Sequence, residues 1–205
     1  MTVNTINQTN AMTTDKNARV HRGWIGLEAG GVLLLILVGT VLALVVVASL
    51  FSKNDTGTEL SNAQFIMNQT RGLLKSKGSY EFSTPAKMTG TLIQFGGIPS
   101  GMTINGTAQS GTATAVNVWG GDVTISPEKV NGSTNNKGFS LTYKNVPQEA
   151  CTTLATKMSE TSLVSELSIS GTNNVGAVSA EKAGTQCKAD NGSVGTNTLI
   201  FKSNN

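Results

Sequence analysis

One acidic side chain in this 205-residue sequence lies where a positive charge is needed to neutralise it. Glu28 lies four residues before an uncharged run of 19 residues, 32–50, and residues 24–51 contain no Lys, Arg or His. An ionised group beside a membrane-length apolar segment is costly unless it is paired. Cleavage after Gly23 would create a main-chain amine on Trp24, four residues before Glu28. A partner for Glu28 within this segment would therefore have to be a main-chain amine freed by proteolysis.

Few other side chains could carry out chemistry. His21 is the single histidine and precedes Gly23, so a chain cut there would have no histidine for a triad, a metal site or general-base catalysis. The two cysteines, Cys151 and Cys187, fit one structural disulfide, and two separate buried thiols are the alternative. The acids after residue 77 show no paired spacing. We expect no catalytic residues, no metal ligands and no cofactor.

The composition favours a β-rich, secreted type of domain. The chain is 13% charged, against about 25% for an average soluble domain, and it contains 23 glycines. Its net charge of +3 is too small for the many contacts between basic side chains and phosphates on which nucleic-acid binding depends. Direct binding of nucleic acid is therefore not expected.

The uncharged run at 32–50 is long enough to cross a hydrocarbon layer as a helix. No small-residue signal-peptidase site follows it, so we expect the segment to remain in the protein. Lys16, Arg19 and Arg22 precede it and favour a cytoplasmic N-terminus. The rest of the chain would then lie outside the cytoplasm.

The stretch Arg22 to Glu28, RGWIGLE, resembles the processing signal of type IV prepilins. The resemblance implies that a prepilin peptidase cuts between Gly23 and Trp24 and that the Trp24 amine can be methylated. It also implies that Glu28 neutralises the N-terminus of an adjacent subunit during filament assembly. Trp24 in place of phenylalanine, together with a 23-residue leader, points to the type IVb branch of enteric and conjugative-plasmid pilins.

On this basis the chain divides into four parts. Residues 1–23 are a cleaved leader, 24–52 the membrane and polymerisation half of a long helix, 53–76 its amphipathic half, and 77–205 a globular head. Helical periodicity supports the third part, because apolar or small residues recur at intervals of three and four. These residues are Leu60, Ala63, Ile66, Met67, Thr70, Leu73 and Leu74.

We expect an α+β fold, in which the long N-terminal helix packs against an antiparallel sheet. Breaker-rich residues 77–101 and 171–198 are predicted as loops, and Pro147 is predicted to open a short helix. The resemblance implies that a disulfide bounds a C-terminal region, 151–187. The stretches predicted as strands are 101–104, 113–118, 122–126, 139–143, 163–170 and 199–201, several of them separated by Asn-Gly or Gly-Gly.

The resemblance predicts a structural major subunit of an extracellular pilus, not an enzyme. Its expected partners are identical subunits in a helical homopolymer, the prepilin peptidase and the assembly machinery. The chain would reside in the bacterial inner membrane before assembly. The filament would serve adhesion to a host cell or mating-pair contact with a recipient cell. The alternative is a minor pilin or tip adhesin of the same filament system.

Overall fold

The computed structural model describes residues 34, 38, 54–130 and 132–204. The chain divides into two compact units, residues 1–49 and 50–205, and the second contains nearly everything that is described. Leu34 and Val38 are helical and exposed. Among the described residues, no helix is both long and apolar enough to cross a membrane. Apart from these two residues, the span predicted at 32–50 lies outside the described part.

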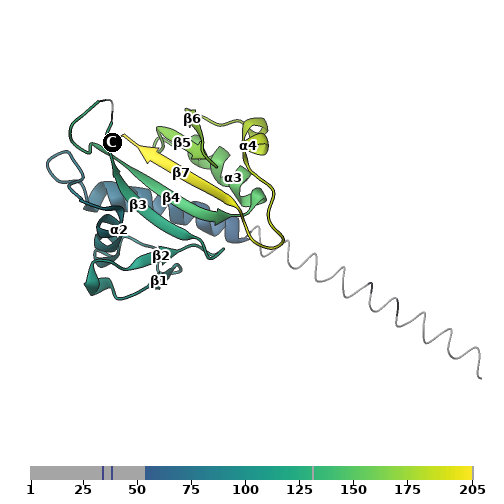
Figure 1. Cartoon of the computed structure of the whole chain (residues 1–205), viewed down its shortest axis with the longest axis horizontal. Coiled ribbons are helices and arrows are strands. Elements are labelled where there is room, and N and C mark those ends of the chain that lie inside the picture. Colours follow the sequence, from purple (N-terminus) through teal and green to yellow (C-terminus); the bar gives the residue numbers. More distant parts are fainter. Residues whose placement is uncertain (1–33, 35–37, 39–53, 131, 205) are drawn as a thin grey trace, which may run out of the picture. The chain divides into compact units, whose positions relative to one another are not determined.

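A helix over residues 54–73 opens the second unit and runs behind the sheet (Figure 1). Its buried side chains follow the predicted spacing, and Ala63, Ile66 and Met67 are fully buried. The inclusion of Leu73 in this face was wrong, because its side chain is 42% exposed. Leu73 follows the buried Thr70 by three residues but lies at the last turn of the helix, where the neighbouring Leu74 takes the inward position.

Seven strands form one antiparallel sheet in the order β1-β2-β3-β4-β7-β5-β6. The central pairs β3·β4 and β4·β7 are the longest, and β1 and β6 are the two edges (Figure 1). The strands are β1 (Thr103–Asn105), β2 (Thr114–Val116), β3 (Asp122–Glu128), β4 (Gly138–Val146), β5 (Glu166–Ile169), β6 (Thr172–Val175) and β7 (Asn197–Ser203).

The register gives the sheet one apolar face and one polar face. Residues directly opposite one another in an antiparallel pair point to the same side. One such row is Ile125, Leu141, Phe201 and Leu167, all fully buried. The adjacent row on the other side consists of Ser126, Ser140, Lys202 and Glu166. The core therefore lies on one side only, under the helices.

The prediction of a loop over 77–101 was wrong, because helix α2 (Pro85–Gln94) occupies its middle. The Thr84 hydroxyl caps the helix by accepting a hydrogen bond from the Lys87 amide at 3.3 Å, and Pro85 takes a first-turn position where its missing N–H costs nothing. Gly90 was interpreted as a breaker, but it permits close packing: a Cβ there would lie 2.2 Å from the Gly111 carbonyl oxygen.

The C-terminal part contains more regular structure than predicted. Helix α3 (Gln148–Ser159) follows Pro147 as expected, and it buries Cys151, Leu154, Ala155 and Met158. The loop predicted over 171–198 was wrong, since it contains β6 and helix α4 (Ala180–Gln186). Short elements such as these carry little periodic signal, and they form because β5 and α3 supply surfaces against which to pack.

Candidate functional site

A buried carboxylate joins the start of the 54–73 helix to the sheet. Glu59 is 2% exposed, and its Oε1 accepts a hydrogen bond from the Val118 amide at 2.8 Å. Its Oε2 accepts one from the Asn62 side chain at 3.2 Å. Val118 belongs to the turn between β2 and β3, which Asn117 closes by accepting hydrogen bonds from the Trp119 and Gly121 amides. This contact fixes the angle at which the helix enters the head.

The same carboxylate faces Tyr143 of β4. Burial raises the pKa of the Tyr143 hydroxyl well above its usual value, and the Glu59 charge and hydrogen-bonding capacity beside it raise it further. The hydroxyl lies close enough to Glu59 for this effect, yet its geometry falls short of a regular hydrogen bond. Tyr143 therefore remains neutral at neutral pH.

Two hollows flank this first part of the helix. One has a volume of about 390 Å³ and lies between Asp55, Thr58 and Asn62 of the helix and Met102 and Val116 of the sheet edge. The other, of about 310 Å³, lies between Thr56 and Gly57 of the helix and Glu149 and Thr153 of α3. Both contain exposed polar side chains. The described part of the chain contains no cluster of His, Cys, Asp or Glu suited to a metal ion.

The disulfide joins the two helices of the C-terminal region. Cys151 in α3 and Cys187 after α4 are bonded, with their Cα atoms 5.9 Å apart. Asn197 secures the loop that returns from Cys187 to β7: its amide donates to the carbonyls of Val146 and Lys188 and accepts from the Lys188 amide and the Ser170 hydroxyl. All four bonds are made by a fully buried side chain.

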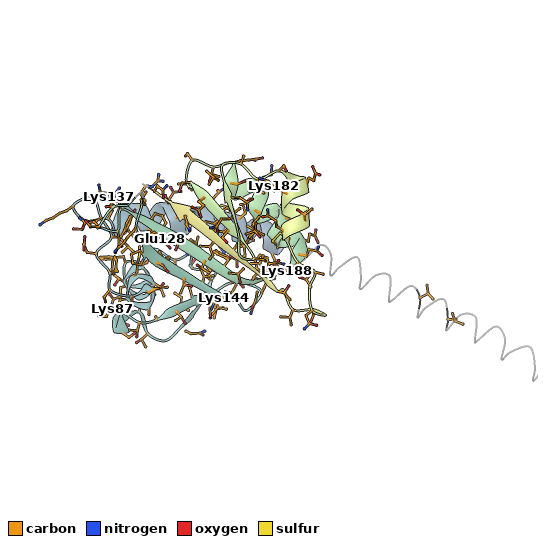
Figure 2. The ribbon with its side chains drawn as sticks, turned by 45° about the horizontal axis from the view of Figure 1, so that its top comes forward. Lys87, Glu128, Lys137, Lys144, Lys182 and Lys188 are labelled. Atoms are coloured by element: carbon orange, nitrogen blue, oxygen red, sulfur yellow. A yellow bond between two sulfur atoms is a disulfide. The ribbon has the colours of Figure 1, made fainter. Side chains whose placement is uncertain are left out.

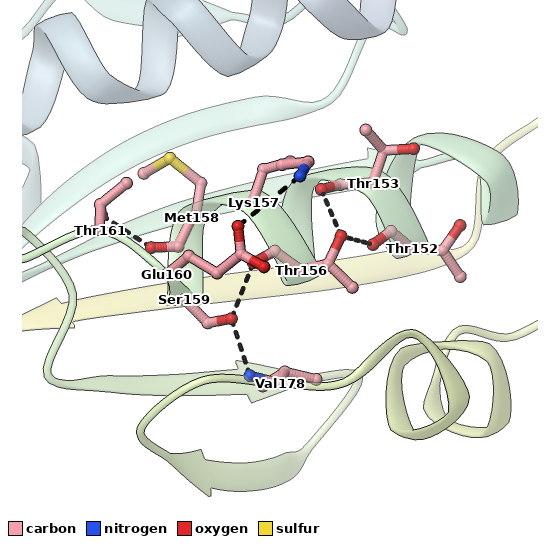
Figure 3. A network of polar contacts seen from close by, with 9 residues as sticks. All are labelled: Thr152, Thr153, Thr156, Lys157, Met158, Ser159, Glu160, Thr161 and Val178. Atoms are coloured by element: carbon pink, nitrogen blue, oxygen red, sulfur yellow. Dashed lines mark hydrogen bonds and ion pairs between the residues drawn. The ribbon is translucent and has the colours of Figure 1, made fainter.

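Side-chain hydroxyls of α3 complete this region (Figure 3). Thr152, Thr153 and Thr156 bond to carbonyls one turn earlier in their own helix. Ser159, at its end, accepts a hydrogen bond from the Val178 amide at 2.9 Å and so attaches the segment between β6 and α4. The region 151–187 is thus a layer of short elements held by one covalent bond and many polar contacts.

Similar proteins identify this arrangement. Residues 53–204 match the family model described as PilS N terminal. The crystal structure of type IV b pilin from Salmonella typhi matches with a TM-score of 0.65 and 44% identity, over 73% of this chain and 99% of that one. This chain belongs to the type IVb pilin family.

A second solved structure agrees with this assignment. The NMR structure of the type IVb pilin PilS from Salmonella typhi matches with a TM-score of 0.50 and 44% identity, over 72% of this chain and 95% of that one. No curated protein matches the chain. The predicted α+β pilin fold with one disulfide is therefore confirmed.

The sequence predicted two kinds of site residue in this pilin. Cys151 and Cys187 form the expected bridge. Gly23, Trp24 and Glu28, interpreted as cleavage site, methylated amine and assembly acid, lie outside the described residues. Their roles remain predictions. Trp119 is half-buried against the core.

Sequence reasoning missed the two residues that organise this pilin head most. Glu59 lies four residues before Ala63 and seven before Ile66, so it is an acid on the apolar face of an amphipathic helix. That position was a usable signal, because a buried carboxylate needs a donor. Asn197 gave no comparable signal: its four partners come from Val146, Ser170 and Lys188, which only the folded chain brings together.

Proposed function

We propose that this pilin is the structural major subunit of an extracellular type IVb pilus and has no catalytic activity. One observation carries the proposal. The match to the pilin family begins at residue 53, directly after RGWIGLE and the uncharged run at 32–50. A pilin head that follows a cleavable, membrane-length apolar segment has the parts needed to insert, be processed and polymerise.

In the proposed mechanism, the subunit first waits in the inner membrane with its head outside the cytoplasm. A prepilin peptidase cuts between Gly23 and Trp24, and the new amine can be methylated. During assembly the Glu28 carboxylate of one subunit pairs with the Trp24 amine of its neighbour, because an unpaired charge in an apolar environment is costly. The apolar segment then exchanges contact with lipid for contact with the same segment of identical subunits.

Replacing Glu28 tests this mechanism. Glu28→Ala should leave membrane insertion and cleavage intact and abolish incorporation into filaments sheared from the cell surface. Asp15→Asn is the matched control, because it removes an acid from the leader, which cleavage discards. Normal filaments from Glu28→Ala would contradict the proposed assembly role, and so would filament loss in Asp15→Asn with cleavage unaffected.

The position of the subunit in the filament separates the proposed role from its alternative. Antibody labelling along the whole shaft is expected for a major subunit, whereas labelling confined to tips would assign a minor pilin or tip adhesin. The proposed filament serves attachment to a host cell or contact with a recipient cell. Comparing surface adhesion with plasmid transfer in a deletion strain distinguishes these two uses.

A further inference from the structure

The head has two opposite ends, which the strand directions define. Asp122 begins β3, Val146 ends β4 and Asn197 begins β7, so all three lie at one end. Glu128 and Gly138 are paired at the other end, where Ser203 also lies. The 54–73 helix starts at the first end, where Glu59 binds Val118, and finishes at the second, where Arg71 binds Ser203. Its 20 residues place the two ends about 30 Å apart.

Positive charge collects at the end where the helix finishes. A tight turn at 76–79 follows the helix, with Lys77 and Gly78 at φ of 49° and 84°, and its neighbour Tyr80 bonds to Asn136. We call the four exposed lysines around this contact the lysine patch. Within the described residues none of them forms an ion pair, whereas the local acids Glu81 and Glu128 accept hydrogen bonds from serines. The lysine patch consists of Lys75, Lys77, Lys129 and Lys137.

Negative charge collects at the end where the helix starts. Glu149 lines the hollow beside Thr56 and Gly57, and Asp190 accepts a hydrogen bond from the amide of Gln148 at 2.8 Å. We call Asp55, Glu149 and Asp190 the acidic patch. Figure 2 shows the two ends through labelled side chains, with Lys137 of the lysine patch at one end and Lys188, two residues before Asp190, toward the other.

The charge counts of the two ends are opposite. Apart from the ion pair Lys202–Glu166, whose charges cancel, the lysine end has five cations and two acids, a net charge of +3 over described residues. The other end has five acids and two lysines, a net charge of −3, and it stays acidic when the charge of the preceding Lys53 is added. At the lysine end, the cations are Arg71 and the lysine patch, and the acids are Glu81 and Glu128. At the other end, the acids are the acidic patch, Glu59 and Asp122, and the lysines are Lys144 and Lys188.

We propose that the lysine patch of one head contacts the acidic patch of a second copy in the filament. Within one molecule the patches are about 30 Å apart, several times the screening length of about 8 Å at physiological salt. Only another molecule can bring the opposite charges together. A contact between two different surfaces of identical subunits builds an open helical polymer whenever its rotation does not close into a ring. The inference rests on the proposed pilus function.

The acidic end also has the shape to receive a partner. The hollows of about 390 and 310 Å³ lie on either side of the helix start, and the acids Asp55 and Glu149 line one each. The tight turn that carries Lys77 projects from the opposite end. Opposite charges here would select register and orientation between subunits, which is the main contribution of electrostatic complementarity at interfaces.

Zero-length cross-linking of wild-type filaments tests the contact directly. A carbodiimide joins a lysine amine to a carboxylate only where the two touch, and mass spectrometry identifies the linked peptides. We expect links between the lysine patch and the acidic patch. Because the patches are about 30 Å apart in one chain, every such link joins two copies. The internal pairs Lys144–Asp122, Lys157–Glu160 and Lys202–Glu166 are built-in positive controls.

Links at the three internal pairs without any link between the patches would overturn the inference. Absence of this chain from the filaments would instead overturn the proposed function. Links that join the lysine patch to acids other than the local Glu81 and Glu128, without any link to the acidic patch, would also reject the contact as proposed.

Charge reversal gives an independent test in cells that express the full chain. Lys75→Glu with Lys137→Glu, and separately Asp55→Lys with Glu149→Lys, should each lower the yield of sheared filaments about tenfold or more, because like charges then face each other. Combining the four changes should restore the yield. Lys87→Glu with Lys182→Glu alters net charge as much as the first variant, at exposed sites outside both patches, and should leave the yield unchanged.

The outcomes separate assembly from folding. Resistance to protease and an intact Cys151–Cys187 bridge in each variant show that a loss of filaments is not a loss of fold. If only the variant of the lysine patch loses filaments, and the combined variant does not restore them, a second copy of the chain is rejected as the partner. The partner of the lysine patch would then be a different, negatively charged molecule. Normal filaments from both patch variants would overturn the inference while leaving the Glu28 test untouched.

Discussion

The two flanks of the sheet are stabilised by different means. On one flank, α3, β5, β6 and α4 are joined by the Cys151–Cys187 bridge and by the Asn197 hydrogen bonds. On the other flank, residues 77–121, α2 packs on β3 without any covalent link. There Gly90 lets the helix approach the Gly111 carbonyl, and the fully buried Tyr80 and Thr89 side chains complete the packing.

The two flanks are built from elements of different length, and this explains why they are held together differently. The disulfide flank divides its buried apolar side chains among several short elements joined by Gly-, Asn- and Ser-rich connections, and a covalent bond holds α3 and the end of α4 together. The α2 flank buries Met88, Leu92 and Ile93 in a single helix and needs only close approach. A chemical change should therefore damage one flank and spare the other.

The largest effect is expected from removing the bridge. Cys151→Ala with Cys187→Ala opens a loop with a sequence separation of 36 residues, which should cost about 3 to 4 kcal/mol of unfolding free energy in the chain-entropy account. Urea denaturation of the full chain measures the loss. Amide exchange should accelerate first in α4 and the 188–196 loop, while α2 keeps its protection. Equal loss of protection in both flanks would show that they form one cooperative unit.

The second effect comes from filling the space at Gly90. Gly90→Ala places a methyl group 2.2 Å from a backbone oxygen, so α2 must shift away from the 107–112 segment at a cost of about 3 kcal/mol. Gly184→Ala in α4 is the matched control, because no atom lies within 4 Å of its added Cβ and the helix should gain about 1 kcal/mol. Thermal unfolding of both variants checks the opposite signs. A stabilising Gly90→Ala would contradict the close approach.

Alkaline pH should weaken the protein through its two tyrosines without breaking the bridge. Burial raises the pKa of Tyr80 to about 12, with Arg71 opposing the shift, and burial also raises that of Tyr143. A folded-state pKa above the unfolded value of about 10 gives stability that is complete below pH 10 and is lost as the pH rises through 12. For Tyr80 alone the loss is about 2 kcal/mol by pH 12.

Tyrosinate absorbance measures this directly, because the chain contains only two tyrosines. Folded protein should ionise about two pH units later than protein unfolded in denaturant. Coincident titration curves would mean that the tyrosines are solvated in the folded state.

The smallest effect is expected at Thr89. Its hydroxyl accepts from the Ile125 amide at 2.9 Å and donates to the Ile125 carbonyl at 3.3 Å, at a point of β3 beyond the end of β2. Thr89→Val keeps the shape and removes both bonds, which should cost about 1 to 2 kcal/mol. Thr153→Val is the control, since that exposed hydroxyl bonds only within its own helix. Equal effects of the two variants in urea denaturation would contradict a stabilising role for the two hydrogen bonds between Thr89 and Ile125.

Regular patterns in the sequence were better guides to the structure than isolated helix breakers. Periodic and paired signals were reliable: the spacing of Ala63, Ile66 and Met67 and the two cysteines each described the observed structure. Local breakers were misleading, because Pro85 starts a helix and Gly90 lies inside one. A glycine indicates either a turn or a close approach, and only the neighbouring Gly111 decides between them.

The candidate site shows the same limit. Because Glu59 is an acid on an apolar helix face, the sequence indicates that it needs a hydrogen-bond donor. The sequence does not indicate which donor, since its partner Val118 lies 59 positions away and belongs to a different element. The opposed charge patches could not be predicted either. Their members are scattered from Asp55 to Asp190, and the direction of each strand decides at which end each residue lies.

The most direct test of the proposed pilus role is the intact mass of the subunit in filaments sheared from the cell surface. We expect this chain to be the principal component and to begin at Trp24, with or without a methyl group on its amine. A chain that still carries residues 1–23, or that begins elsewhere, would contradict the proposed processing. Filaments that do not contain this chain would contradict its role as their subunit.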